Sequence, residues 1–162
     1  MNDRKKALDR LKELNIDYQL LEHEAAFTIE DMDNIDLEHE EYIIKNLFLR
    51  DSNGKRHFLV VVDKDKKTDL KKLRNEIGCS ALSFASEERL LKHLDVKKGS
   101  VSPLGIINDC EKTVEVIIDK DLLNKKLIGI HPNDNTASVF IKPKDLIKII
   151  QASGNKLYYI NI

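Results

Sequence analysis

The chain has 162 residues, 41% of them hydrophobic and 34% charged, and its formal net charge is −1. A chain of this length buries a core without disulfides or metals, so we expect one domain over residues 1–162. The near-zero net charge excludes a protein that binds polyanions over its whole surface. No apolar run approaches the ~20 residues that span a bilayer, so no membrane partner is expected. Two distant cysteines favour a reducing, cytoplasmic setting.

Charge is unevenly distributed along the chain. Residues 22–41 hold nine acidic side chains and no lysine or arginine, whereas residues 45–98 hold fourteen basic side chains against eight acidic ones. Such a bias produces a local positive face on a neutral protein. Ordinary solvated surface lysines are the alternative.

Apolar periodicity predicts the elements of the first third of the chain. Helical spacing predicts a helix over 3–14, and alternation predicts a strand over 17–23. The acidic piece 28–41 is expected to form a short helix and a loop. Strands over 42–51 and 56–63 are expected to pair as a hairpin.

The middle of the chain predicts two helices around a short strand. Thr68 is expected to cap a helix that Gly78 ends. A strand over 81–85 then precedes a helix over 87–94, capped by Ser86. The inward residues of these helices are expected to be Leu70, Leu73, Ile77, Leu90, Leu91 and Leu94.

The last third predicts strands at 113–119, 126–131, 137–142 and 156–162. A helix over 144–153 is expected to start beside Pro143 and to end at Gly154. Many strands with short links predict an α+β fold with a twisted mixed, mostly antiparallel β-sheet, or a partly open barrel, flanked by helices.

The usual catalytic signatures are absent from this sequence. It contains no HExxH, no paired Cys/His spacing, no phosphate-binding glycine loop and no GxSxG. We therefore expect no metal site and no cofactor.

The stretch 97–110, "KKGSVSPLGIINDC", concentrates special backbone residues. Gly99 and Gly105 permit close backbone approach and Pro103 stiffens the turn between them. Such a loop can direct main-chain N–H groups at an oxyanion. A helix end followed by an ordinary turn is the alternative.

Two further stretches contain polar residues at unusual places. In the apolar run 43–49, Lys45 shares a strand face with Leu47, and Asn46 lies on the opposite, apolar face. There Asn46 needs a hydrogen-bond partner, and Lys45 needs water, an anion such as phosphate, or an exposed face. His131 ends a predicted strand at the mouth of a hairpin, where it can line a small pocket or serve a structural role.

These stretches together resemble a known family. "LEHEAAFTIEDM", "IKNLFLRD", "LSFASEERLLKHLDVKKGSVSPLGIINDCEKTVEVIID" and "GIHPNDNTASVFI" occur in the order found in the YbaK-like prolyl-tRNA editing family, in its freestanding ProX/PrdX-like form. The resemblance runs from about Leu21 to the C-terminus. It implies a twisted sheet or partly open barrel with a pocket for the aminoacyl group and the terminal adenosine of tRNA.

The resemblance also implies roles for individual residues. Lys45 would hold a terminal phosphate or orient the adenosine, Asn46 would bond ribose or aminoacyl groups, and His131 would shape the pocket. The catalytic wall is expected to comprise Lys45, Asn46, Gly99, Ser100, Val101, Ser102, Pro103, Gly105 and His131. Substrate-binding residues are expected at Phe27, Thr28, Leu47, Asn135, Thr136 and Ala137.

The implied activity is trans-editing of mischarged proline tRNA, above all of Ala-tRNA(Pro). Water would attack the aminoacyl ester, with backbone stabilisation of the oxyanion and help from the substrate ribose hydroxyl. The expected partners are the acceptor end of proline tRNA, contacted partly by the basic stretch 45–98, and prolyl-tRNA synthetase. A deacylase that prefers cysteine or serine, and a non-catalytic module that binds tRNA or a synthetase, are the alternatives.

Overall fold

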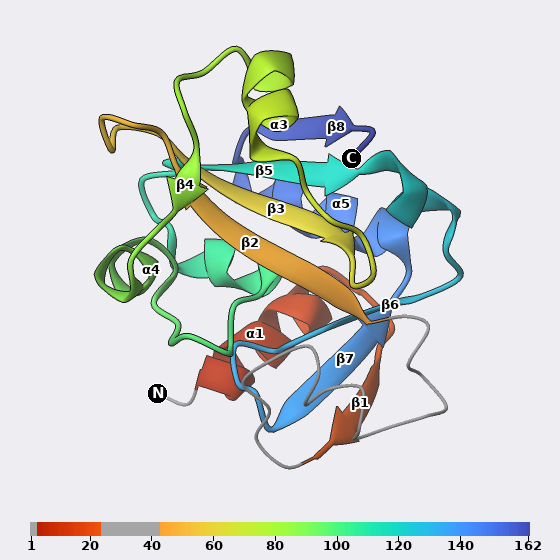
Figure 1. The fold of residues 1–162 in the computed structure, drawn as a ribbon. Helices are drawn as coiled ribbons and strands as arrows, with labels where there is room; N and C mark the ends of the chain where they lie inside the picture. The colour runs from red at the N-terminus through yellow and green to blue at the C-terminus, as the bar shows by residue number, and fades with distance from the viewer. Residues whose placement is uncertain (1–2, 24–42) are drawn as a thin grey trace.

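The computed structural model describes residues 3–23 and 43–162. Figure 1 shows the strands at the centre with helices on either side. In chain order the elements are α1 (Asp3–Glu13), β1 (Gln19–Glu22), β2 (Ile44–Arg50), β3 (His57–Asp63), α3 (Leu70–Ile77), β4 (Ser83–Phe84), α4 (Glu87–Leu94), the 3₁₀ helix η2 (Pro103–Asn108), β5 (Val114–Asp119), the 3₁₀ helix η3 (Lys120–Asn124), β6 (Ile128–Ile130), β7 (Ala137–Ile141), α5 (Pro143–Ser153) and β8 (Leu157–Ile160).

The strands form two sheets. One sheet has the order β4-β2-β3-β5-β8, and it is mixed, because β2 pairs antiparallel with β3 and β4 while β5 pairs parallel with β3 and β8. The other sheet has the order β1-β7-β6 and is antiparallel. The expected α+β fold with a mixed sheet is confirmed, as two sheets and not a closed barrel.

The larger sheet has apolar side chains on both faces. On β3, Leu59 and Val61 face the main core, which includes residues of α1, α4, η2 and α5. Phe58, Val60 and Val62 point to the opposite face, where Leu73 of α3 packs on them. Figure 1 shows α3 alone on its side of this sheet and α1 on the other. β3 is therefore a central strand with apolar residues in succession, which is typical of strands buried on both faces.

Two local predictions on the middle helices are wrong. Asp69, not Thr68, caps α3, and its carboxylate accepts from the amides of Lys71 and Lys72. Leu91 is 48% exposed, because α4 packs through Leu90 and Leu94 and the intervening side chain points away from the core. The predicted helix within 28–41 lies outside the described residues. None of the described helices is long and apolar enough to cross a membrane.

A buried carboxylate fixes the segment that follows η2. Asp109 is 5% exposed and accepts hydrogen bonds from the Val114 amide at 2.8 Å and from Asn155 Nδ2 at 2.9 Å. The Thr113 hydroxyl donates to its other oxygen at 3.0 Å. One side chain thereby joins η2, β5 and the turn before β8.

Replacing Asp109 by alanine is expected to lower the free energy of unfolding by about 3 kcal/mol, because it leaves buried donors without an acceptor. Asp109→Asn keeps an acceptor oxygen and is expected to cost less. Urea unfolding measures both, with Asp65→Ala on the exposed β3–α3 turn as the control. Equal unfolding midpoints for the two alanine variants would contradict this role.

Candidate functional site

The site lies along one edge of β2, where that strand is only partly paired. At its start, Ile43 forms an isolated bridge with Gly129 of β6. At its end, Leu49 pairs with Phe84 of β4. Between these two attachments the outer edge of β2 has no neighbouring strand among the described residues. The two sheets diverge there and leave a cavity.

The ladder geometry directs the main chain of Asn46 into this gap. Asp51 donates its amide to the Arg56 carbonyl on the β3 side, whereas the Phe48 carbonyl accepts from the Ala85 amide on the β4 side. In an antiparallel pair, the main-chain groups of successive residues point alternately to the two sides. Asn46, two residues from Phe48, therefore points its own N–H and C=O away from β3.

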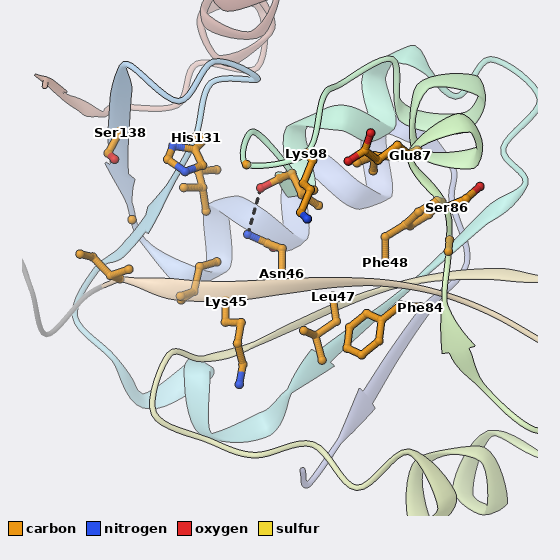
Figure 2. A pocket seen from close by; sticks show the side chains of 18 residues that line it. Lys45, Asn46, Leu47, Phe48, Phe84, Ser86, Glu87, Lys98, His131 and Ser138 are labelled. Carbon is orange, nitrogen blue, oxygen red and sulfur yellow. Dashed lines mark hydrogen bonds between the residues drawn. The ribbon is translucent and has the colours of Figure 1, made fainter. Parts of the chain in front are cut away.

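The cavity has a volume of about 570 Å³, within the range of small-molecule sites. Its walls are mainly apolar, with a few polar groups from β2, α4, the 98–101 loop and the β6–β7 hairpin (Figure 2). The lining residues are Ile43, Ile44, Lys45, Asn46, Leu47, Phe48, Phe84, Ala85, Ser86, Glu87, Leu90, Lys98, Gly99, Val101, Gly129, Ile130, His131 and Ser138.

The Asn46 side chain is only half satisfied. Its Nδ2 donates to the Val101 carbonyl at 3.3 Å, the contact drawn as a dashed line in Figure 2. Its Oδ1 is buried and has no hydrogen-bond partner among the described residues. A buried acceptor without a donor costs free energy.

His131 presents a neutral acceptor to the cavity. Its Nδ1 lies 3.0 Å from the Ala137 carbonyl. Since a carbonyl only accepts, Nδ1 donates, and Nε2 of the neutral ring is left as an acceptor. Burial lowers the pKa of His131 below its ordinary value of 6.5, although the Ala137 carbonyl opposes this shift.

A second histidine lies behind the cavity wall. The Phe48 ring stacks on His57 with 5.7 Å between ring centroids. Burial, together with His93 and Arg89, lowers the pKa of His57 to about 4. Both histidines are therefore uncharged at neutral pH.

The glycine–proline loop divides into two parts. Gly99, with φ of 90°, and Val101 line the cavity. Ser102 and Pro103 instead begin η2, where the Ser102 hydroxyl accepts from the Leu104 amide and donates to the His131 carbonyl at 2.5 Å.

Gly105 and Ser100 do not line the cavity, and their contacts are with the helix and loop that form its wall. Gly105 is buried inside η2, and a Cβ there would come within 3.1 Å of Leu94 of α4. The Ser100 amide donates to the Lys97 carbonyl. The main-chain amides of Gly99 and Val101 donate no hydrogen bond to any of the described residues.

Lys45 and Leu47 project from β2 on the face opposite Asn46 (Figure 2). The Lys45 ammonium donates to the Lys66 carbonyl. Leu47 packs against the core under α3. Both residues contribute to the cavity lining, but the Lys45 ammonium does not lie beside Asn46 and His131 in this structure.

Of the remaining expected substrate-binding residues, the three that the structure describes do not line the cavity. The Thr136 hydroxyl donates to Asp134 at 2.6 Å and accepts from Arg4, which joins the β6–β7 turn to α1. Ala137 is buried and Asn135 is half-buried in the same turn region. Phe27 and Thr28 lie outside the described residues.

Sequence reasoning missed several lining residues. Phe84 and Glu87 reach the cavity because Ser86 caps α4 at its rim, and Lys98 reaches it from the loop after α4. The sequence predicted the cap at Ser86 but not that this end of the helix faces the cavity. Ser138 also lines it, and its hydroxyl lies 3.0 Å from Nε2 of His23. No sequence signal pairs residues 23 and 138, because the β1–β7 register brings them together.

Comparisons with known proteins identify the family of the chain. Residues 23–149 match the aminoacyl-tRNA editing domain family. The chain is 49% identical over its whole length to the prolyl-tRNA editing protein ProX of Acetoanaerobium sticklandii, covering 99% of that protein. It is 35% identical to the prolyl-tRNA synthetase associated domain-containing protein 1 of Danio rerio, over 91% of this chain and 81% of that protein.

A solved structure shares the fold. The crystal structure of a candidate trans-editing enzyme for prolyl tRNA synthetase superposes with a TM-score of 0.73 at 17% identity, covering 100% of this chain and 98% of that one. The family match spans most of the chain, and the expected resemblance is confirmed. The chain belongs to the aminoacyl-tRNA editing domain family and is an aminoacyl-tRNA deacylase.

Proposed function

We propose that this enzyme edits proline tRNA in trans and removes alanine from it. The name of the A. sticklandii relative supports proline tRNA as the substrate. The observation that carries the proposal is the cavity at the open edge of β2, where main-chain donors and two uncharged polar side chains, Asn46 and His131, meet. Its volume of about 570 Å³ exceeds what one small amino acid needs, and so leaves room for the terminal nucleoside.

The reaction needs a positioned water and an oxyanion site. Water adds to the ester carbonyl carbon, the bond to the ribose oxygen breaks, and the released ribose oxygen takes up a proton. The Asn46, Gly99 and Val101 amides are the donors available to the developing oxyanion. The adjacent ribose hydroxyl of the substrate helps to hold the water. Asn46 Oδ1 and His131 Nε2 accept from the substrate ammonium or from the water.

Lys45 would contact the nucleic acid and not the ester. It lies on the β2 face that also carries Leu47, so a phosphate there would replace the Lys66 carbonyl as its partner. The basic residues within 45–98 would add further phosphate contacts. Prolyl-tRNA synthetase is the proposed source of the mischarged tRNA.

A panel of mischarged tRNAs tests the function. We expect the enzyme to release alanine from proline tRNA faster than cysteine or serine, and to leave proline attached, because the part of the cavity left for the amino acid once the nucleoside is bound would exclude the larger ring. Released amino acid is measured over time with radiolabelled substrates, and an enzyme-free reaction serves as the control. Faster release of cysteine or serine would reassign the substrate, and no release of any amino acid would refute the proposal.

Substituting Asn46 tests the contact of its side chain with the substrate ammonium or the water. Asn46→Ala keeps the main-chain amide but removes Oδ1 and the Nδ2 contact with the Val101 carbonyl, and kcat/KM is expected to fall about 100-fold, because a hydrogen bond to a charged group contributes roughly 1.5–3 kcal/mol. Asn46→Asp keeps the acceptor and is expected to retain more activity than the alanine variant. Thermal unfolding checks that both variants fold.

Ser138→Ala is the matched comparison, since this residue is also buried and lines the cavity. If water is the nucleophile, Ser138→Ala is expected to keep most of the wild-type activity. Complete loss, with a covalent aminoacyl adduct on the wild-type enzyme, would assign the Ser138–His23 pair as nucleophile and base instead.

The pH profile tests His131. Its pKa is lowered by burial, so the neutral acceptor persists from alkaline pH to below 6.5 and is lost only when the ring gains a proton at lower pH. His131→Asn keeps a donor for the Ala137 carbonyl but has no Nε2. We expect the wild-type to variant ratio of kcat/KM to stay constant above pH 6.5 and to fall only at lower pH, where the ring gains a proton. A ratio that already falls above pH 6.5, or that rises on acidification, would contradict the role.

A further inference from the structure

Phe84 is the most exposed of the large apolar side chains among the described residues, at 65% exposure. It is not on a remote surface, because it lines the rim of the same cavity as Asn46 and His131. An exposed aromatic ring beside a binding cavity has apolar surface that a ligand can cover.

The fold holds this ring in place. Phe84 pairs with Leu49 at the edge of the larger sheet, and the next residue, Ala85, donates its amide to the Phe48 carbonyl at 2.9 Å. Ser86 then caps α4 by accepting from the Arg89 amide. The backbone is therefore tied on both sides of the ring.

Leu47 supports the ring from below. As a residue two positions before Leu49 on the same strand face, it is a diagonal neighbour of Phe84, within reach of an aromatic side chain. Figure 2 shows both side chains on the face of β2 that also carries Lys45. Phe84 and Leu47 thus form an apolar surface beside Lys45 on this face, and both also line the cavity.

We propose that Phe84, supported by Leu47, is a stacking surface for an unpaired base at the 3′ end of the tRNA. The inference rests on the proposed function, because an ester bound near Asn46 places the last nucleotides at the rim. Bases stack on aromatic rings irrespective of their identity, which suits a 3′ end common to all tRNAs. Lys45 and Lys98 on the cavity lining are placed to meet the flanking phosphates.

Kinetics give the first test. Phe84→Ala is expected to raise KM for mischarged tRNA about tenfold with little change in kcat, since stacking positions the nucleic acid and leaves the ester contacts intact. Phe84→Tyr is expected to restore KM. Leu91→Ala, at a residue that is 48% exposed on α4 and does not line the cavity, is the matched control and is expected to keep wild-type values.

A binding measurement separates this inference from the proposed function. The sequence has no tryptophan, so Phe84→Trp introduces a single indole at the rim. Uncharged proline tRNA is expected to quench its fluorescence, and the same tRNA without its unpaired 3′ nucleotides is expected to quench it at least about tenfold more weakly. This readout needs no hydrolysis.

Three outcomes would overturn the stacking role. These are equal quenching by the intact and shortened tRNAs, an unchanged KM in Phe84→Ala, and quenching by prolyl-tRNA synthetase but not by tRNA. The last would assign the ring to a protein interface. If the wild-type enzyme releases no amino acid while the indole still responds to the 3′ end, the proposed function fails and the stacking surface stands.

Discussion

The site depends on how β2 is paired. Backbone groups of a strand edge need hydrogen-bond partners, and β2 finds them at Ile43 through β6 and at Leu49 through β4. Among the described residues, no strand pairs with the stretch between them. Because antiparallel pairing alternates the direction of main-chain groups, Asn46 offers N–H, C=O and side chain to the same small volume. The unpaired stretch of β2 thus supplies the polar groups of Asn46 to a cavity whose walls are mainly apolar.

The rest of the cavity is arranged around uncharged groups. Burial keeps His131 and, behind Phe48, His57 neutral. An uncharged environment of low polarity strengthens the interaction of fixed N–H groups with a developing negative charge. Charged side chains lie at the periphery, with Lys98 and Glu87 on the lining and Lys45 turned to the other face of β2. On this separation we base the proposal that nucleic acid is contacted at the periphery and that the ester reacts in the interior.

The glycine–proline loop shows how far one stretch of sequence can be interpreted. Its composition indicates a special backbone, and Gly99 does adopt a left-handed conformation at the cavity. Ser102 and Pro103, however, are the cap and first residue of η2, and Gly105 is small because Leu94 packs on it. Composition alone does not distinguish a glycine needed for a ligand from one needed for helix packing, because the distinction lies in a neighbour distant in sequence.

The sequence by itself determined most helices and strands, the α+β class and the family, because apolar periodicity and capping residues act locally and the family stretches occur in order. It also placed Asn46, Gly99, Val101 and His131 in one group. Only the tertiary structure decided that Lys45 points away from them, and that Phe84 and Ser138 join the cavity. Strand register and the meeting of two sheets set these positions, and both arise from pairings between residues far apart along the chain.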